Sequence, residues 1–445
     1  MRPLPSLVLL ALPACAGIEA ARRAEDPRSA APGERTVSAG EVGLGLGSTL
    51  SLDRALEIAL ASNPSVAIAR RHADAAEARL RQAGGPLLPQ VRLSGGLNAE
   101  VSGRGISGGT EDARTHQETL AASLLLFDFG KTSALRRQAA KEFLATRADL
   151  RAAENDVVFD VRAAFFSVLR QEALVNVAEE TVRQFEKRLE QTQGFVEVGT
   201  RVRYDLTKAE VDLGNARLAL LQAQTALKDD RALLDAALGL AEEVAVPLEA
   251  RPAGDEETPA FEALVEEARA HHPQLEAQAL REDAACETIE AAIADFFPSV
   301  SLQASFARSG SFAPSAWSAL LGPALDAVLY AGGEKSGRLE EVVADLRATR
   351  AAKAQIEQQL FLQIRQACTQ LTDARERRKI LDLTVQQATE NLDLVQGRYA
   401  IGRASSVELT DGQVTLANAR GSRIQARFDV EIAIAALKRS VGEVR

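Results

Sequence analysis

Two acidic residues near the end of the chain, Glu408 and Asp411, form a pair whose type and spacing could influence how ions approach the protein. Residues three apart lie on the same face of a helix, so a helix at this point would present both carboxylates to one side. A surface lined by carboxylates attracts cations and repels anions. The pair therefore suggests an electrostatic role for the surface that this helix borders; the alternative is that Glu408, like Asp205 at the matching place in the first copy, only complements the helix dipole in a first turn.

Elsewhere, the residue types that usually carry catalysis or bind metals lack the necessary spacing. The three cysteines form no CxxC pair, and the Gly-rich run 43–47 is not followed by the GK[ST] of a phosphate loop. His271 and His272 precede Pro273 at an expected helix bend, where we expect them to face solvent. None of the four histidines, His72, His116, His271 and His272, fits an HExxH or paired-ligand pattern. We therefore expect no enzyme, no cofactor and no metal site.

The composition favours long packed helices. Hydrophobic residues make up an ordinary 46% of the 445 residues, but aromatic residues make up only 4%, which is low for a compact core of this size. Ala, Leu, Arg, Glu and Gln dominate, as they do in long helices. The net charge of -10 argues against a nucleic-acid partner, because phosphate binding needs clustered Lys and Arg.

The chain is a tandem duplication. The stretch VGTRVRYDLTKAEVDLGNAR (198–217) returns as IGRASSVELTDGQVTLANAR (401–420). Farther upstream, Asn63-Pro64 is matched by His272-Pro273. Two copies of one large unit do not make a solenoid, which needs shorter and more numerous repeats. The duplication therefore suggests a pseudo-symmetric molecule.

Each copy begins with a helix and a pair of strands. Apolar residues at three- and four-residue steps predict a helix that starts after the N-cap Ser51 and ends at Gly84. Apolar and polar residues then alternate over 90–102, which predicts a strand, and a second extended stretch follows at about 118–129. The second copy repeats this plan over 298–330.

Each copy ends in a long helical hairpin. The helices are expected at 133–197, 204–238, 336–400 and 407–440. The two longer ones would each extend roughly 100 Å at the usual rise per residue. Gly199 and Gly402 follow them, where a C-cap glycine belongs. The repeated stretch is therefore the tip of a hairpin, and it occurs twice because the molecule has two hairpins.

These patterns divide the chain into five parts. Residues 1–16 read as a secretory signal, followed by a flexible lead at 17–48. The first repeat spans 49–240, a linker spans 241–259, and the second repeat spans 260–442. Leu12-Pro13-Ala14-Cys15 resembles a bacterial lipobox, in which Cys15 would be lipidated, but it also fits an ordinary A-x-A cleavage site.

The strands raise the question of a membrane. The strand at 90–102 is longer than the 9–11 residues that cross a bilayer as a tilted strand, and it has one apolar and one polar face. Four strands cannot close a barrel, and an open edge cannot lie in lipid, so membrane insertion would require several copies to share one barrel. The alternative is two soluble hairpins of strands packed on the helices.

The order of these features resembles the TolC-type outer membrane efflux protein family over about 49–442. The likeness rests on the helix with Asn-Pro, the strand pair, the turns LFDFGK (126–131) and LYAGGEK (329–335), and the tip pattern G-x-x-x-x-x-[DE]-L, all occurring twice. It implies a mainly α fold with a small β part. Three chains would share a twelve-stranded transmembrane β-barrel, and their helical hairpins would form an α-barrel tunnel.

The resemblance also implies a function and partners. The protein would be the bacterial outer-membrane exit duct of a tripartite efflux pump or type I secretion system, and would extend into the periplasm. Its partners would be two further copies of itself, a periplasmic adaptor, an inner-membrane transporter and outer-membrane lipid. A secreted coiled-coil scaffold without a pore is the alternative. An adaptor lipoprotein fits less well, because adaptors have one helical hairpin whereas this chain has two equal halves.

The family's gate and tip residues have counterparts here. Glu408 and Asp411 match the acidic ring at the periplasmic aperture, where six carboxylates in a trimer would raise some of each other's pKa values. Tyr399 and Asp205 match a tyrosine–aspartate bond between the hairpins that holds the tunnel closed. Ala404 stands where the family often has an arginine. The residues expected to contact the adaptor are Gly199, Thr200, Arg201, Gly402 and Arg403.

Overall fold

The computed structural model divides the chain into two compact units. The hairpin unit is drawn from Met1–Arg70, Leu150–His272 and Gln358–Arg445, and the sheet unit from Arg71–Asp149 and Pro273–Glu357. The structure describes residues 31, 33–35, 37–38, 40–41, 49–102, 111–200, 202–242, 246–249, 259–310 and 316–443. The expected signal segment with Cys15, most of the flexible lead, Arg201 and much of the expected linker lie outside these residues.

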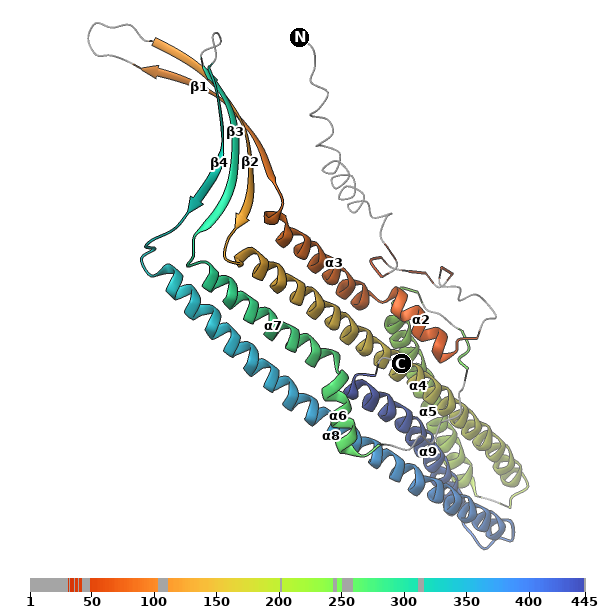
Figure 1. The fold of residues 1–445 in the computed structure, drawn as a ribbon. Coiled ribbons are helices and arrows are strands. Elements are labelled where there is room, and N and C mark those ends of the chain that lie inside the picture. Colours follow the sequence, from red (N-terminus) through yellow and green to blue (C-terminus); the bar gives the residue numbers. More distant parts are fainter. Residues whose placement is uncertain are drawn as a thin grey trace. The chain divides into compact units, whose positions relative to one another are not determined.

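The same series of elements occurs twice along the chain (Figure 1). The first series is α2 (Leu52–Ser62), α3 (Pro64–Gly84), β1 (Gln90–Ser102), β2 (Glu111–Phe127), α4 (Lys131–Glu197) and α5 (Arg203–Leu238). The second is α6 (Phe261–His271), α7 (Pro273–Ala294), β3 (Ser299–Gly310), β4 (Ala316–Asp326), α8 (Glu334–Ala400) and α9 (Ser406–Val441). The expectation of a mainly helical fold with duplicated helical hairpins and a small β part is confirmed.

The first expected helix is broken in two at Asn63. Asn63 is extended (ψ 127°), because the ring of Pro64 disfavours helical geometry in the residue before it. Its side chain accepts a hydrogen bond from the Ser65 backbone (2.8 Å) and donates one to the Ala237 carbonyl (2.9 Å). The break therefore ties the start of the chain to the end of α5, within the hairpin unit.

The second copy breaks at the matching point, His272-Pro273, and here one expectation was wrong. His272 is 6% exposed, whereas we expected it to face solvent. Burial lowers its pKa to about 4, although Asp156 acts in the opposite direction. The extended conformation that Pro273 favours (ψ 122°) ends α6 at this residue, and the surrounding helices cover the ring. His271 beside it is exposed, as expected.

The four strands form one antiparallel sheet in the order β1-β2-β3-β4 within the sheet unit. β2 begins at Glu111, earlier than the 118 expected, because its first residues continue the ladder with β1 out to the pair Ser102–Glu111. That segment is polar and does not alternate, so its pairing was invisible in the sequence. β4 contains Pro323, which lies opposite Leu302 of β3 and has no backbone N–H to donate to a neighbouring strand.

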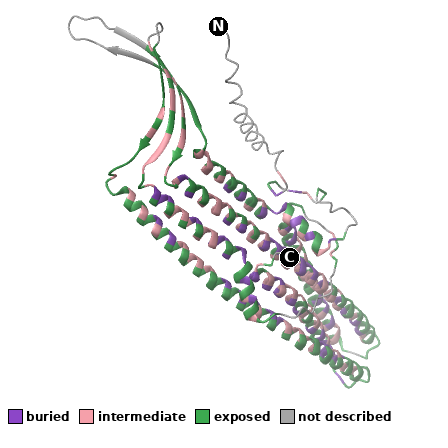
Figure 2. Ribbon diagram, in the orientation of Figure 1, coloured by how far each residue is buried: buried purple, intermediate pink, exposed green. Residues whose placement is uncertain are grey.

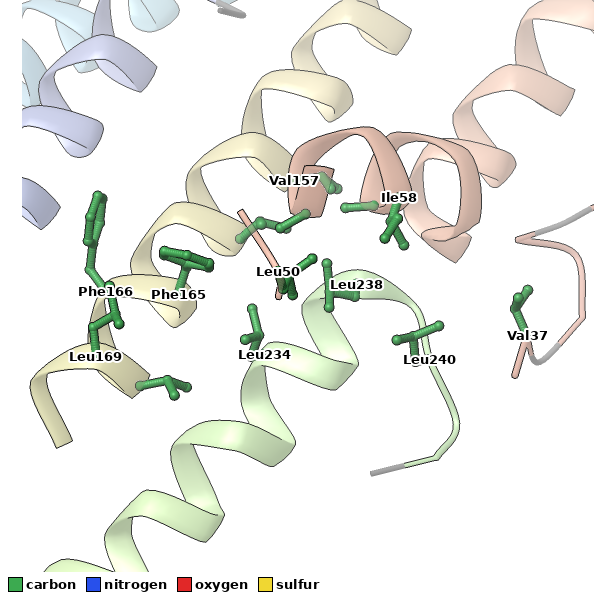
Figure 3. Close-up of a cluster of buried hydrophobic side chains, with 14 of the residues drawn as sticks. Val37, Leu50, Ile58, Val157, Phe165, Phe166, Leu169, Leu234, Leu238 and Leu240 are labelled. Carbon is green, nitrogen blue, oxygen red and sulfur yellow. The ribbon is translucent and has the colours of Figure 1, made fainter. Parts of the chain in front are cut away.

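The largest core lies in the hairpin unit (Figure 3). Phe165 of α4 projects towards Leu234 and Leu238 of α5, and the same cluster includes Phe166, Leu169, Ile58 of α2 and the N-terminal residues Val37 and Leu50. Phe165 is fully buried. The cluster joins segments from both ends of the first copy, which explains why the short α2 is held at this place. Among the described helices, none has a stretch long and apolar enough to cross a bilayer.

Candidate functional sites: the hairpin tips and the sheet

Both long helices end in the same glycine turn. Gly199 has φ 77° and Gly402 has φ 74°, values that favour glycine. At the first tip the backbone N–H of Thr200 donates to a carbonyl five residues earlier (2.9 Å), and Arg403 does the same at the second (2.8 Å). This pairing closes the last helical turn and reverses the chain. The expected position of both tips is confirmed.

The tip residues expected to contact a partner are exposed where the structure describes them. Gly199, Thr200, Gly402 and Arg403 are all exposed. Two apolar neighbours missed in the sequence are exposed with them: Val198 (79%) and Ile401 (69%) occupy matching places in the two copies. Apolar side chains at such exposure are available to a partner surface. Ala404 is buried, so this position adds no side chain to that surface.

Glu408 and Asp411 are both exposed on α9, one turn apart. Within one chain Glu408 also caps its own helix, because its Oε1 accepts hydrogen bonds from the backbone N–H and the hydroxyl of Ser405 (both 3.1 Å). Those bonds, with Arg398 at 3.5 Å, lower the pKa of Glu408. The direction is the reverse of that expected from a ring of acids, because these are contacts inside a single chain. The signal was present as Ser-x-x-Glu, a capping box.

Asp205 and Tyr399 both lie at the tips. Asp205 reaches the second hairpin: its Oδ1 accepts a hydrogen bond from the hydroxyl of Ser406 (3.0 Å). Tyr399 is half-buried and packs against an apolar cluster of α8 and α9 that includes Leu392 and Leu409. The expected bond between Tyr399 and Asp205 remains a prediction.

Sequence reasoning missed Arg188, which is 9% exposed in α4. Its Nη1 donates to Gln413 Oε1 (3.0 Å) and its Nη2 to the Ser406 carbonyl (2.6 Å), both in α9. Thr410 of α9 likewise lies against Asp212 of α5 (3.2 Å). The available signal was position: Arg188 comes three residues after the buried Phe185, on the face that packs inwards.

The sheet carries one apolar and one polar face. The register places residues whose side chains project from the same face of the sheet opposite one another across all four strands. One such row is Leu93, Leu120, Phe306 and Ala319. The next row reads Ser94, Thr119, Ala307 and Ser318, and projects from the opposite face. The pattern expected for β1 extends across the sheet in these rows, but the next row on the apolar side, Gly95, Glu118, Arg308 and Trp317, includes two charged residues.

The apolar face of the sheet is uncovered in a single chain. Leu93 (67%), Trp317 (71%) and Leu321 (73%) are exposed, and Figure 2 shows no buried stretch along the coloured parts of the strands. An exposed apolar surface of this extent marks a contact with lipid or with another protein.

Aromatic side chains gather at two levels of the sheet. Where the strands meet the helices, the Phe129 ring lies 4.8 Å from both Phe127 and Phe297. Farther along, Phe306 and Trp317 stack at 6.2 Å. The run from Phe297 to Phe306 corresponds to about 30 Å of extended chain. Tilted by about 40°, it would give about 23 Å of height, close to the apolar band of outer-membrane barrels.

The described residues contain no group of three His, Cys, Asp or Glu side chains that could hold a metal ion. The surfaces that remain as candidates are therefore the tips and the sheet. The tips present charged and exposed apolar residues where the chain reverses. The sheet presents faces of different polarity. Neither arrangement positions a nucleophile with a base.

Comparison with known proteins agrees with this arrangement. A family model described as "Outer membrane efflux protein" matches residues 55–240 and 264–443. The chain is 26% identical over 408 residues to the probable efflux pump outer membrane protein TtgC of Pseudomonas putida, covering 85% of this chain and 80% of that protein.

Solved structures show the same fold. A membrane protein from Pseudomonas aeruginosa gives a TM-score of 0.77 at 23% identity, covering 88% of this chain and 91% of that one. The CmeC outer membrane channel of Campylobacter jejuni also gives 0.77, at 16% identity, covering 88% and 85%.

Proposed function

Because the chain belongs to the outer membrane efflux protein family, we propose that it is an outer-membrane exit duct of a tripartite efflux pump or type I secretion system. The observation that carries this proposal is the apolar face that all four strands share in the rows nearest the helices, which a single chain leaves largely exposed. A barrel wall places such a face against lipid and its polar face against water. A soluble coiled-coil scaffold has no use for it, so this alternative is not favoured.

The edges of the sheet support a trimer. β1 and β4 each have one unpaired edge in a single chain. Unpaired backbone groups cost several kcal/mol each in lipid, so β1 of one copy would pair with β4 of the next until the barrel closes. Three copies would give twelve strands, and the six helical hairpins would form one tunnel wall in the periplasm.

The tips would form the gate of this tunnel. Glu408 and Asp411 are exposed on one helix, and three copies would place six carboxylates around the mouth, which would favour cations. Tyr399 and Asp205 would hold the second hairpin against the first. The Ser406–Asp205 bond supports this role for Asp205, because the carboxylate reaches the second hairpin through it.

The tips would also receive the adaptor that links the duct to an inner-membrane transporter. The matched exposed residues of both tips, Gly199, Thr200, Gly402 and Arg403 with Val198 and Ile401, fit a partner that meets both hairpins alike. Arg201 belongs to the same contact by its position in the sequence. The duct would be passive, without enzymatic activity, cofactor or nucleic acid.

The domain division also stays part of the proposal. Residues 1–16 would direct secretion, with Cys15 as the candidate for lipidation, ahead of the two repeats at 49–240 and 260–442. Mass spectrometry of the N-terminal peptide of the mature protein, taken from membranes, would distinguish a lipidated Cys15 from simple cleavage.

The pore is tested by single-channel recording. Protein extracted from membranes is added to a planar bilayer, and the wild type is compared with Glu408→Ala/Asp411→Ala. We expect discrete cation-selective steps in the wild type and weaker selectivity in the variant, because the mouth loses its charge. The matched control is Asp373→Ala/Glu376→Ala, which removes an exposed acidic pair of the same spacing from α8, much farther from the tip. It should change selectivity less.

Absence of current from a correctly folded, membrane-extracted oligomer would contradict the proposal of an exit duct and favour the coiled-coil scaffold without a pore. Current with equal selectivity in both double variants would keep the pore but displace its mouth from Glu408 and Asp411.

A further inference from the structure

Three polar residues of α9, Ser406, Thr410 and Gln413, lie along the boundary between the two hairpins of one chain. Their spacing of four and then three residues places them on one face of the helix. Each of them meets a charged residue of the first hairpin: Arg188 of α4, or Asp205 or Asp212 of α5.

Ser406 is held at both of its polar groups. Its carbonyl accepts a hydrogen bond from Arg188 Nη2 (2.6 Å), and its hydroxyl donates one to Asp205 Oδ1 (3.0 Å). Arg188 also reaches Gln413, almost two helical turns farther along α9 (3.0 Å). One guanidinium therefore spans this part of the boundary and fixes the position of α9 against α4.

The two hairpins contribute different kinds of groups to these contacts. At this level the first hairpin supplies the ions and the second supplies a carbonyl, an amide and hydroxyls, all neutral. Farther from the tip the hairpins meet through an ion pair instead, between Arg420 and Glu180 (3.2 Å). A buried guanidinium needs its hydrogen bonds, and charge-assisted bonds to neutral acceptors are stronger than bonds between two neutral groups. Arg188 differs from Asp205 and Asp212 in making two charge-assisted bonds to α9 from a buried position.

We propose that Arg188 is the latch residue that holds the second hairpin against the first and so keeps the tip closed. The proposal rests on the proposed function, since it concerns the gate of that duct. Parting the hairpins exposes Arg188 and Asp205 to water together with the ion pair Lys208–Asp212 (3.3 Å). That surface carries two cations and two anions, so it hydrates without net charge. The latch can therefore release and close again.

The test is single-channel recording of full-length protein carrying Arg188→Gln, which removes the charge but keeps a polar side chain. Loss of a charged hydrogen bond corresponds to at least about a tenfold change in an equilibrium. We expect open events at least about ten times more frequent than in the wild type. Arg188→Lys, which keeps the charge but not the two-pronged contact, should fall between them.

The matched control is Arg217→Gln. Arg217 contacts Glu186 (2.8 Å) inside the first hairpin, and both side chains are exposed. The control removes the same charge near the tip but no bond between hairpins, so its opening frequency should equal that of the wild type. Equal opening in the two glutamine variants would mean that lost charge, and not the latch, opens the tip.

A variant on the other side of the contact separates the latch from a folding defect. Gln413→Met removes the acceptor with little change in volume and should also increase opening. Combined with Arg188→Gln it should add little, because both changes break the same bond. Fully additive effects would contradict the latch.

Asp205→Ala/Tyr399→Phe distinguishes failure of the latch from failure of the duct. If this variant opens while Arg188→Gln and Gln413→Met behave as the wild type, the latch proposal is wrong and the duct stands. If no protein in the set conducts, the duct itself is refuted and the latch with it.

Discussion

The hairpin unit and the sheet unit are stabilised in different ways. All four clusters of buried apolar side chains found among the described residues lie in the hairpin unit, and the largest contains Phe165, Leu50 and Leu238. Buried residues of the sheet unit's helices are mainly alanines, such as Ala134, Ala145 and Ala277. Alanine buries little area, so the apolar contribution per residue is smaller in the sheet unit.

Ion pairs take the place of a core between the helices of the sheet unit. They join α4 to α7, or to Asp295 directly after it, and α7 to α8. The pairs are Lys131–Asp295, Arg137–Glu287, Lys141–Asp283, Asp149–Arg281, Glu282–Arg350 and Glu282–Lys353. Such partly exposed pairs contribute about 0–1 kcal/mol each. The hairpin unit is therefore held by its own core, whereas the sheet unit depends on many weak contacts; in the proposed duct, further copies and lipid would add to them.

Loss of the hairpin core should destabilise the protein most. Phe165→Ala should lower the free energy of unfolding by about 3–5 kcal/mol, because it leaves a cavity in a fully buried site. Chemical denaturation of the detergent-solubilised protein measures it. Phe195→Ala, at a site 49% exposed near the end of the same helix, is the matched control and should cost much less. Equal losses would show that the core does not dominate the hairpin unit.

Lowering the pH should decrease the free energy of unfolding by an intermediate amount, through His272 of the hairpin unit. The pKa of His272 falls from the ordinary 6.5 to about 4 because the ring is buried, so the folded state holds it neutral. The contribution of neutral His272 to the free energy of unfolding is complete above pH 6.5 and is lost as the pH falls towards 4. The loss is at most about 3 kcal/mol.

Denaturation between pH 7.5 and 5 checks this, with His272→Asn expected to flatten the profile. His271→Asn, at the exposed neighbour, should keep the wild-type slope. An unchanged slope in His272→Asn would assign the acid sensitivity to other groups.

Removing Glu282, which forms two ion pairs in the sheet unit, should matter least. Glu282 accepts hydrogen bonds from Arg350 (2.9 Å) and Lys353 (3.1 Å), which lower its pKa. Glu282→Gln should cost about 1 kcal/mol, and salt at about 1 M should remove most of that difference by screening.

Hydrogen exchange of peptides from 273–357 localises the change. Glu341→Gln provides the control, since Glu341 is exposed and forms no ion pair with any residue that the structure describes. A loss larger than that in Phe165→Ala would reverse the comparison of the two units.

Local sequence patterns predicted most of the fold. The features that were missed depend on contacts between segments that are distant in the sequence. Gly199 and Gly402 marked both tips, because only a few residue types suit a left-handed turn. Arg188 was missed because an arginine in a helix normally faces water. Its burial depends on Ser406 and Gln413, more than two hundred residues later. His272 was missed for the same reason, since its burial depends on surrounding helices.

The duplicated tips also differ in how their returning helices start. α9 begins with the Ser405–Glu408 capping box, whereas Val202, at the start of α5, forms no side-chain cap. Capping by Ser or Thr is worth about 1 kcal/mol, so the first turn of α5 frays more readily than that of α9. The return turn of the second hairpin is therefore the more firmly fixed of the two, and local unfolding at the tips should begin at the start of α5.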